Sequence, residues 1–444
     1  MDINHSSLPP IQAPWMETTL QNTEFLEQIF GIVEGPFHLL EPESFAHNLT
    51  EFENILQKHQ VSGHVFYAKK ANKAAIWLKV AALFNGFADV ASIAEFAHAL
   101  ACGIKGTHIG VSGAAKSNDL LQLACQHNAL VAIDALDELQ RALETADVTQ
   151  PLRILLRVLP PEFPDSRFGL NPADLQIALQ KCVENSHLIT MEGFSFHLDG
   201  YDVLPCAKLG FQLIEQCLEA RKMGLAAHSI SIGGGFACAY TTKEHWDNFQ
   251  KNLNPAQFHG GKTFTKFYPY HQAPTGAVML DAILQSKKGE QNFAQALNQA
   301  DITLLMEPGR ALLNGAGLSV FPVQGFKQND AHGIITVAGL SMSLSEQWKA
   351  SEFLPDPYLV QRGKEREQQP ILACIGGSSC MEYDMLSWRK ISFPARPRYG
   401  DLIIYPNTAG YQMDKNESTF HQLPLPPKVI VWLNENGLDW SMDQ

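Results

Sequence analysis

The chain has 444 residues, a length that suits two domains better than one. Apolar residues make up 45% of it and charged residues 18%, which is the balance of an ordinary globular protein with material for a sizeable core. The formal net charge of -13 argues against nucleic acid or an anionic membrane as the main partner, although it leaves room for a local basic pocket.

The cysteine pattern and the N-terminal residues predict a cytoplasmic protein. Eight cysteines are scattered without a CxxC pair, so the sequence predicts no disulfide framework and no metal site. Reduced thiols are typical of the cytoplasm, where we expect this protein. The first residues lack the basic region and apolar core of a signal peptide, and no apolar run is long enough to span a bilayer.

Residues 1–42 predict an N-terminal arm with a short helix, followed by a strand-like run at Phe37–Leu40. Ser44 is expected to cap the next helix, because Phe45, Leu49 and Phe52 follow it at helical spacing.

Residues 43–310 alternate short β-rich runs with amphipathic helical stretches, the pattern of an α/β protein. Eight runs separated by helices favour a parallel (β/α)8 barrel of the TIM type, with a doubly wound open sheet as the alternative. The predicted strands span residues 64–68, 87–91, 107–111, 130–133, 152–158, 193–197, 229–232 and 303–306.

The stretch 239–299 is too long for one barrel unit and is rich in aromatic residues. Long insertions after barrel strands often lie over the active face, so a substrate lid and a peripheral decoration both remain open. Residues 311–444 show no helix alternation and predict a C-terminal β-barrel or sandwich domain, which the run at Phe37–Leu40 is expected to join. The predicted strands of this domain span residues 317–323, 333–337, 371–374, 401–405 and 428–433.

Chemically useful side chains stand where the predicted barrel strands end. Functional residues of such barrels gather at the C-terminal ends of the strands, so these side chains are expected to converge on one rim. Three consecutive glycines after the seventh strand favour a phosphate site, because backbone N–H groups approach an anion freely where no Cβ intervenes. The residues on this rim are Lys69, Lys70, Asp89, Arg157, His197, Gly233, Gly234, Gly235, Glu307, Gly309 and Arg310.

The motifs on this rim resemble the fold-type III PLP-dependent decarboxylases, the family of diaminopimelate, ornithine and arginine decarboxylases. The family's lysine motif Y-A-x-K-A-N appears here as residues 67–72. The motif selects Lys70 over Lys69, and strand alternation would place the two on opposite faces. Further matches, in the family's order from about residue 35 to 415, are DVAS at 89–92, SRFG at 166–169, FH at 196–197, IGGGF at 232–236, EPGR at 307–310, Cys380 with Asp384, and Gly410 with Tyr411.

The resemblance implies that pyridoxal 5'-phosphate (PLP) forms a Schiff base with Lys70 and that the enzyme decarboxylates an amino acid. It assigns Glu307 to the pyridine nitrogen and His197 to the ring face. It places Gly234, Gly235, Gly309, Arg310 and Tyr411 around the phosphate, and Asp89 and Arg157 near the ring. Cys380 is the implied proton donor after carbon dioxide leaves. Its segment crosses to the neighbouring subunit in this family, so a homodimer with shared active sites is expected.

The sequence departs from the family pattern mainly at positions that contact the substrate in that family. The acid usually found after the cysteine is Met381, with Glu382 one residue later as a candidate replacement and Asp384 beyond it. Asp199 and Gly200 stand where the family has glycine and serine, and Val337 replaces an aspartate. A diaminopimelate-, ornithine- or lysine-like substrate and a specialised substrate therefore both remain open. Two other outcomes also remain: a PLP-dependent racemase or epimerase, and a catalytically silent regulatory homologue.

Overall fold

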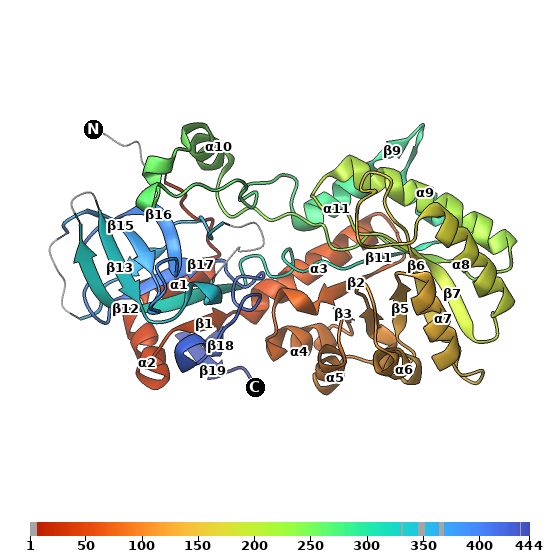
Figure 1. Ribbon diagram of the computed structural model, residues 1–444, viewed down its shortest axis with the longest axis horizontal. Coiled ribbons are helices and arrows are strands. Elements are labelled where there is room, and N and C mark those ends of the chain that lie inside the picture. Colours follow the sequence, from red (N-terminus) through yellow and green to blue (C-terminus); the bar gives the residue numbers. More distant parts are fainter. Residues whose placement is uncertain (1–6, 330–331, 345–350, 364–367, 436) are drawn as a thin grey trace.

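The computed structural model describes residues 7–329, 332–344, 351–363, 368–435 and 437–444. It separates into a barrel and a β-domain, which lie at opposite ends of the molecule in Figure 1. The helix α3 (Pro42–Lys58) follows directly on a strand of the β-domain and extends into the barrel.

The predicted (β/α)8 barrel is confirmed. Eight parallel strands close it in the described part of the chain, and β11 pairs with β2 through Leu304 opposite Gly63 and Met306 opposite Val65. This closing pair excludes the open sheet. The strands are β2 (Gly63–Ala68), β3 (Phe87–Val90), β4 (Ile109–Val111), β5 (Leu130–Ile133), β6 (Leu152–Arg157), β7 (Ile189–Ser195), β8 (Ser229–Ser231) and β11 (Thr303–Met306).

The helices between these strands bury one apolar side against the barrel. In α3 the buried residues are Phe45, Leu49, Phe52 and Leu56, as their spacing predicts. The predicted cap at Ser44 is wrong: Glu41 is the cap residue, and its carboxylate accepts a hydrogen bond from the Ser44 backbone N–H. The helices after α3 are α4 (Ala75–Leu83), α5 (Ile93–Ala101), α6 (Asn118–Gln126), α7 (Leu136–Thr145), α8 (Pro172–Glu184) and α9 (Val203–Lys222).

The β-domain is a mixed sheet that incorporates the early strand. β1 (Phe37–Leu40) pairs antiparallel with β12 and parallel with β18. The helices α1 (Pro14–Gln21) and α2 (Thr23–Val33) pack on this sheet around a core that includes Leu26 and Leu39. The other strands are β12 (Gly317–Gln328), β13 (Gly333–Val337), β14 (Tyr358–Val360), β15 (Ile371–Gly376), β16 (Met385–Phe393), β17 (Leu402–Pro406), β18 (Lys428–Asn434) and β19 (Gly437–Met442).

The stretch 239–299 divides between the two parts of the molecule. The helices α11 (Gly276–Gln285) and α12 (Phe293–Gln299) pack beside α9, within the helical layer of the barrel. The helix α10 (Lys243–Asn252) instead lies above the β-domain in Figure 1. After it, Phe258 forms a bridge to Arg389 of β16, so residues 239–275 link the barrel to the β-domain.

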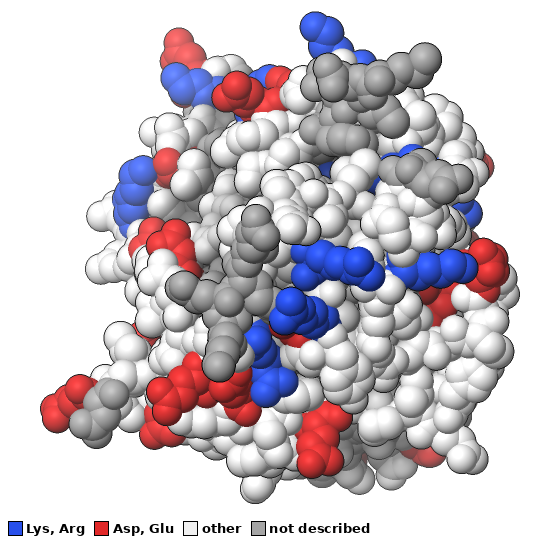
Figure 2. All heavy atoms as spheres, turned by 90° about the vertical axis from the view of Figure 1, so that its left-hand side faces the viewer, with Lys and Arg blue, Asp and Glu red and all other residues white. Residues whose placement is uncertain are grey.

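Two further observations concern the surface. Among the described residues, no helix is both long and apolar enough to cross a membrane. Figure 2 shows the β-domain end, where Lys and Arg side chains gather across the middle of the face although the whole chain is acidic.

Candidate active site

The two adjacent lysines after β2 point to different places. Lys69 is 1% exposed, and its ammonium donates a hydrogen bond to the Lys73 carbonyl. Lys70 lines a cavity of about 410 Å³ at the C-terminal end of the barrel, and its side chain is 46% exposed. Both residues lie in a 3-10 turn rather than on the strand itself. The predicted separation of the two lysines is therefore present, but the turn, and not strand alternation, produces it.

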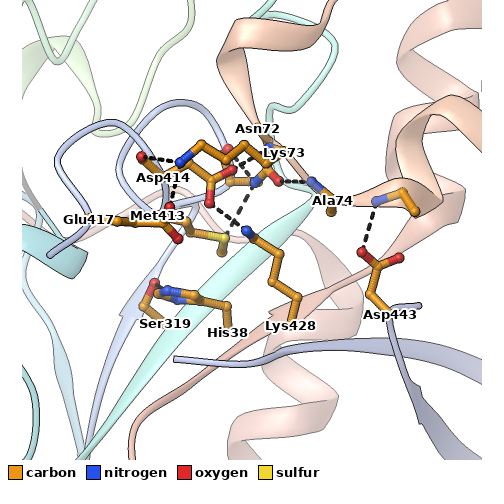
Figure 3. Close-up of polar contacts among 12 residues, drawn as sticks. His38, Asn72, Lys73, Ala74, Ser319, Met413, Asp414, Glu417, Lys428 and Asp443 are labelled. Atoms are coloured by element: carbon orange, nitrogen blue, oxygen red, sulfur yellow. Dashed lines mark hydrogen bonds and ion pairs between the residues drawn. The ribbon is translucent and has the colours of Figure 1, made fainter. Parts of the chain in front are cut away.

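The segment after Lys70 is tied to the β-domain, as Figure 3 shows. The Asn72 side-chain amide donates to the Ala409 carbonyl at 2.9 Å, and the Lys73 backbone N–H donates to Asp414. Asp414 is buried and also pairs with Lys428. Burial by itself raises the pKa of Asp414, but Lys428 and the Lys73 N–H outweigh burial and lower it. These contacts anchor the turn that carries Lys70 to the β-domain.

Two carboxylates surround the Lys70 ammonium. Asp89, at the end of β3, is buried and lies 3.9 Å from Lys70 Nζ. Burial lowers the pKa of Lys70, but the negative charges of Asp89 and Glu307, together with Tyr411, outweigh it and raise the pKa. Burial and the Glu307 charge in turn raise the pKa of Asp89. Lys70 is therefore held as an ammonium until a reaction neutralises it.

Glu307 follows β11 and faces the same cavity. Ser231, at the end of β8, donates its hydroxyl to Glu307 Oε1 at 2.8 Å, and the Glu307 backbone N–H donates to the Gly233 carbonyl at 2.9 Å. These bonds from the neighbouring strand fix the orientation of the carboxylate.

The glycine loop after β8 allows close backbone approach, as its composition predicts. A Cβ on Gly234 would lie 2.2 Å from the Glu307 carbonyl oxygen, and one on Gly235 would lie 2.9 Å from the Gly200 carbonyl oxygen. The Gly234 N–H donates to His197 Nδ1 at 3.2 Å. Burial, Lys70 and Arg157 lower the pKa of His197 to about 3, so the ring is neutral and its Nδ1 is an acceptor.

Arg310 provides the positive charge beside the glycine loop. The guanidinium donates to the Tyr240 hydroxyl at 3.0 Å and to the Gly410 carbonyl at 3.1 Å, and it lies 4.1 Å from the Tyr268 ring centre. Tyr411 completes this wall, and a Cβ on Gly309 would lie 2.9 Å from its hydroxyl. Aromatic rings therefore orient the guanidinium toward the cavity.

Sequence reasoning missed several residues that line the cavity. The missed residues are Tyr201, Lys266, Tyr268, Gln272 and Lys415. Most of them come from irregular segments, and the signal that could have indicated some of them was the aromatic-rich stretch that follows α10.

Asp89 and Gly309 do not line this cavity themselves but adjoin it, Asp89 beside Lys70 and Gly309 beside the Tyr411 hydroxyl. The remaining predicted residues do not line it either in the described structure. Arg157 instead pairs with Asp134 at 3.3 Å and covers the Phe168 ring. Cys380 and Glu382 are exposed on a loop of the β-domain. Asp384 accepts hydrogen bonds from the backbone N–H groups of Ser341 and Ser379, so it shapes that loop.

The donor set of the cavity fits PLP. An amine, a carboxylate, an imidazole and a cation beside a glycine loop face one volume of about 410 Å³. Lys70 would attach the aldehyde carbon, Glu307 would meet the ring nitrogen, and Arg310 with the glycine loop would meet the phosphate.

Comparison with known proteins identifies the family. The model of the "Pyridoxal-dependent decarboxylase, pyridoxal binding domain" family matches residues 44–266. An uncharacterized protein, y4yA of Sinorhizobium fredii, is 33% identical over 409 residues, covering 91% of this chain and 89% of the relative. The diaminopimelate decarboxylase of Bacillus subtilis is 21% identical over 422 residues, covering 90% and 87%.

Solved structures show the same fold at lower identity. Diaminopimelate decarboxylase of M. jannaschii, in co-complex with L-lysine, superposes with a TM-score of 0.74 at 17% identity, covering 93% of this chain and 90% of that one. Lysine/ornithine decarboxylase of Vibrio vulnificus, complexed with putrescine, gives 0.68 at 16% identity, covering 95% and 99%. The chain therefore belongs to the pyridoxal-dependent decarboxylase family, whose members are carboxy-lyases that act on amino acids with PLP.

Proposed function

We propose that this chain decarboxylates an amino acid in the cavity around Lys70, and that the substrate differs from diaminopimelate and lysine at its distal end. The observation that supports the chemistry is the convergence of Lys70, Asp89, Glu307 and Arg310 at one end of the barrel. When bound, PLP accepts the electron pair that remains on the substrate as carbon dioxide leaves.

Each side chain of the cavity has one task in this proposal. The Lys70 amine would hold the cofactor, and the Asp89 carboxylate would pair with the Lys70 ammonium whenever the lysine is free. Glu307, fixed by Ser231, holds a proton at the ring nitrogen. The neutral His197 ring, which lines the cavity, would cover one face of the cofactor and exclude water from it.

Cys380 is the proposed donor of the proton that replaces the carboxylate. It is exposed and its loop does not line the cavity of its own chain. The resemblance of this loop to the family supports its entry into the cavity of a second copy. We therefore propose a homodimer in which each site uses one barrel and the partner's Cys380 loop.

The surroundings of Cys380 support a substrate with an apolar distal end. Met381 occupies the position of the usual acid, and Glu382 beside it is exposed. An apolar pocket of about 390 Å³ adjoins the loop. Most of its wall is apolar, and its lining residues are Leu340, Met342, Met381, Tyr383 and Phe420 together with Ser341, Ser379, Ser418 and Asp384. The Asp384 carboxylate already accepts hydrogen bonds from the Ser341 and Ser379 backbone N–H groups. Such a wall suits an uncharged, bulky group better than the second ammonium of a basic amino acid.

The decisive test measures released carbon dioxide over L- and D-amino acids, including diaminopimelate, lysine, ornithine, arginine, leucine, methionine and phenylalanine. We expect turnover of apolar substrates above the basic ones, and no turnover by Lys70→Ala. The visible absorbance of bound PLP should disappear in Lys70→Ala and persist in the control Lys266→Ala. Loss of optical rotation without carbon dioxide would show a racemase instead, and purified protein that takes up no PLP would refute the proposed function.

A further inference from the structure

A cluster of two histidines and one cysteine lies away from the active cavity. His259 begins the 3-10 turn η4 (His259–Gly261), His332 directly precedes β13, and Cys374 lies in β15. One candidate ligand atom from each residue lies within 4.8 Å of the other two. The three residues are far apart in sequence, which is why spacing motifs predicted no metal site.

The fold, rather than a local motif, brings the three side chains together. β13 and β15 are parallel neighbours, with Ile334 opposite Cys374, so His332 lies at the start of the same pair. The bridge between Phe258 and Arg389 brings the adjacent His259 to β16, where its ring lies 6.2 Å from that of Trp388. The cluster is therefore built where residues 239–275 meet the β-domain.

We propose that His259, His332 and Cys374 bind a divalent transition-metal ion, with zinc as the chemical type. Two imidazole nitrogens and a thiolate are a donor set that zinc prefers. His259 Nδ1 and His332 Nε2 are 2.9 Å apart, and a tetrahedral zinc site separates two nitrogens by roughly 3.3 Å. The two nitrogens are hydrogen-bonded to each other, so an entering ion would replace this hydrogen bond as the rings move slightly apart.

The surroundings of the cluster support an ion. His332 and Cys374 are both buried, so an ion held between them would be largely enclosed by protein. The Cys374 sulfur accepts a hydrogen bond from the His259 backbone, which places these two residues in direct contact. The thiol also contacts the Trp388 carbonyl at 3.2 Å. On binding, the thiol proton passes to solvent, the sulfur–metal bond replaces this contact, and both histidines coordinate as neutral rings.

The position of the ion gives it a structural role with a consequence for the active site. Three protein ligands leave one position for water, and His259 itself is only half-buried. The ion would fasten the segment at His259 to the β-domain. The same segment continues into Lys266, Tyr268 and Gln272, which line the active cavity. Zinc binding is thus expected to fix one wall of that cavity.

The test uses the full PLP-loaded enzyme, stripped with a chelator and then equilibrated with zinc sulfate. We expect about one zinc per chain by elemental analysis and a zinc-edge X-ray absorption spectrum with one sulfur and two imidazole neighbours. His259→Ala and Cys374→Ala should lose this zinc. Cys182→Ala, which removes a buried thiol on α8, should retain it, and so should Cys380→Ala, which removes the exposed thiol near His421.

Three results would overturn the proposal. These are wild-type protein that holds no zinc after equilibration, a zinc spectrum without a sulfur neighbour, and loss of the zinc in Cys380→Ala. The wild-type spectrum decides the matter alone should Cys374→Ala fail to fold. None of these readouts depends on decarboxylation, so the metal site and the proposed function succeed or fail separately.

Discussion

At the scale of single residues, the site is an arrangement of charges that control one another. Lys70 is kept protonated by Asp89 and Glu307, and His197 is kept neutral by burial, Lys70 and Arg157. Cofactor attachment would engage the Lys70 amine and alter this balance of charges. The role of each remaining charge can then be tested by substitutions that keep its shape.

Replacement of Glu307 by glutamine keeps the size of the side chain and removes its negative charge. We expect Glu307→Gln to bind PLP and to lose about 10²- to 10⁴-fold in kcat, because an amide holds no proton at the ring nitrogen. Ser231→Ala removes only the hydroxyl that orients Glu307 and should cost about 10- to 100-fold. Steady-state carbon dioxide release measures both. Equal losses of activity in the two variants would contradict the assignment of Glu307 to the ring nitrogen with Ser231 as its positioning residue.

His38 makes folding stability depend on pH. It is buried in β1, and its Nδ1 lies 2.8 Å from Ser319 Oγ. Burial and Lys428 lower the pKa of His38 from 6.5 to about 3, although Asp414 opposes them. As the pH falls, the unfolded chain therefore takes up a proton on His38 before the folded chain does. The stabilisation of the folded state by neutral His38 is fully present above pH 6.5 and is lost as the pH falls toward 3.

The expected slope can be measured with a variant that does not titrate. Between those two values His38 should contribute up to about 1.4 kcal/mol per pH unit to the loss of unfolding free energy. Urea unfolding of His38→Gln should show a flatter pH dependence than the wild type. His47→Gln, which changes an exposed histidine on α3, should follow the wild-type curve. A wild-type slope in His38→Gln would refute the assignment.

At the scale of elements, the turn that carries Lys70 depends on a loop from the other domain. Asp414 receives the Lys73 backbone N–H and the Lys428 ammonium, as Figure 3 shows. Loss of one member of a buried ion pair leaves the other charge without compensation. The turn and the loop are therefore expected to loosen together.

We expect Asp414→Asn to lose about 3–5 kcal/mol of unfolding free energy and to bind PLP more weakly. Glu417→Gln is a matched control, because Glu417 pairs with the same Lys73, whose side chain is 60% exposed. It should cost at most about 1 kcal/mol. Urea denaturation and PLP titration measure both effects. A similar cost in the two variants would show that Asp414 has no special role.

The barrel elements were more predictable from sequence than the β-domain elements for a physical reason. Barrel strands are covered by helices, so they appear as short apolar runs such as 130–133, whose bounds the structure reproduces. β16 was missed because it contains Arg389, whose buried guanidinium pairs with Asp356 and donates to the Leu354 carbonyl, both distant in sequence. Dependence on contacts distant in sequence also limited prediction of the site. Lys70 could be predicted because it follows a barrel strand, whereas Tyr268 lies in an irregular segment whose position the sequence pattern does not indicate.

At the scale of the whole molecule, the two domains carry different parts of the proposed chemistry. The barrel carries Lys70 and Glu307, and the β-domain carries Cys380 on an exposed loop that does not line the cavity. In the proposed dimer, a complete site combines the barrel of one chain with the loop of the other. A closed two-fold assembly would then contain two such shared sites.

Mixing inactive subunits tests this arrangement directly. Lys70→Ala lacks the barrel function and Cys380→Ala lacks the loop function, so a mixed dimer retains one site with both residues intact. After equal amounts exchange subunits, half of the dimers are mixed, and we expect about a quarter of wild-type carbon dioxide release. Lys70→Ala mixed with Glu307→Gln is the matched control, because both changes lie in the barrel and no mixed dimer contains an intact site. No recovery in the test mixture despite proven exchange would mean that each chain completes its own site. Recovery in the control would show that the regained activity does not come from sites shared between two chains.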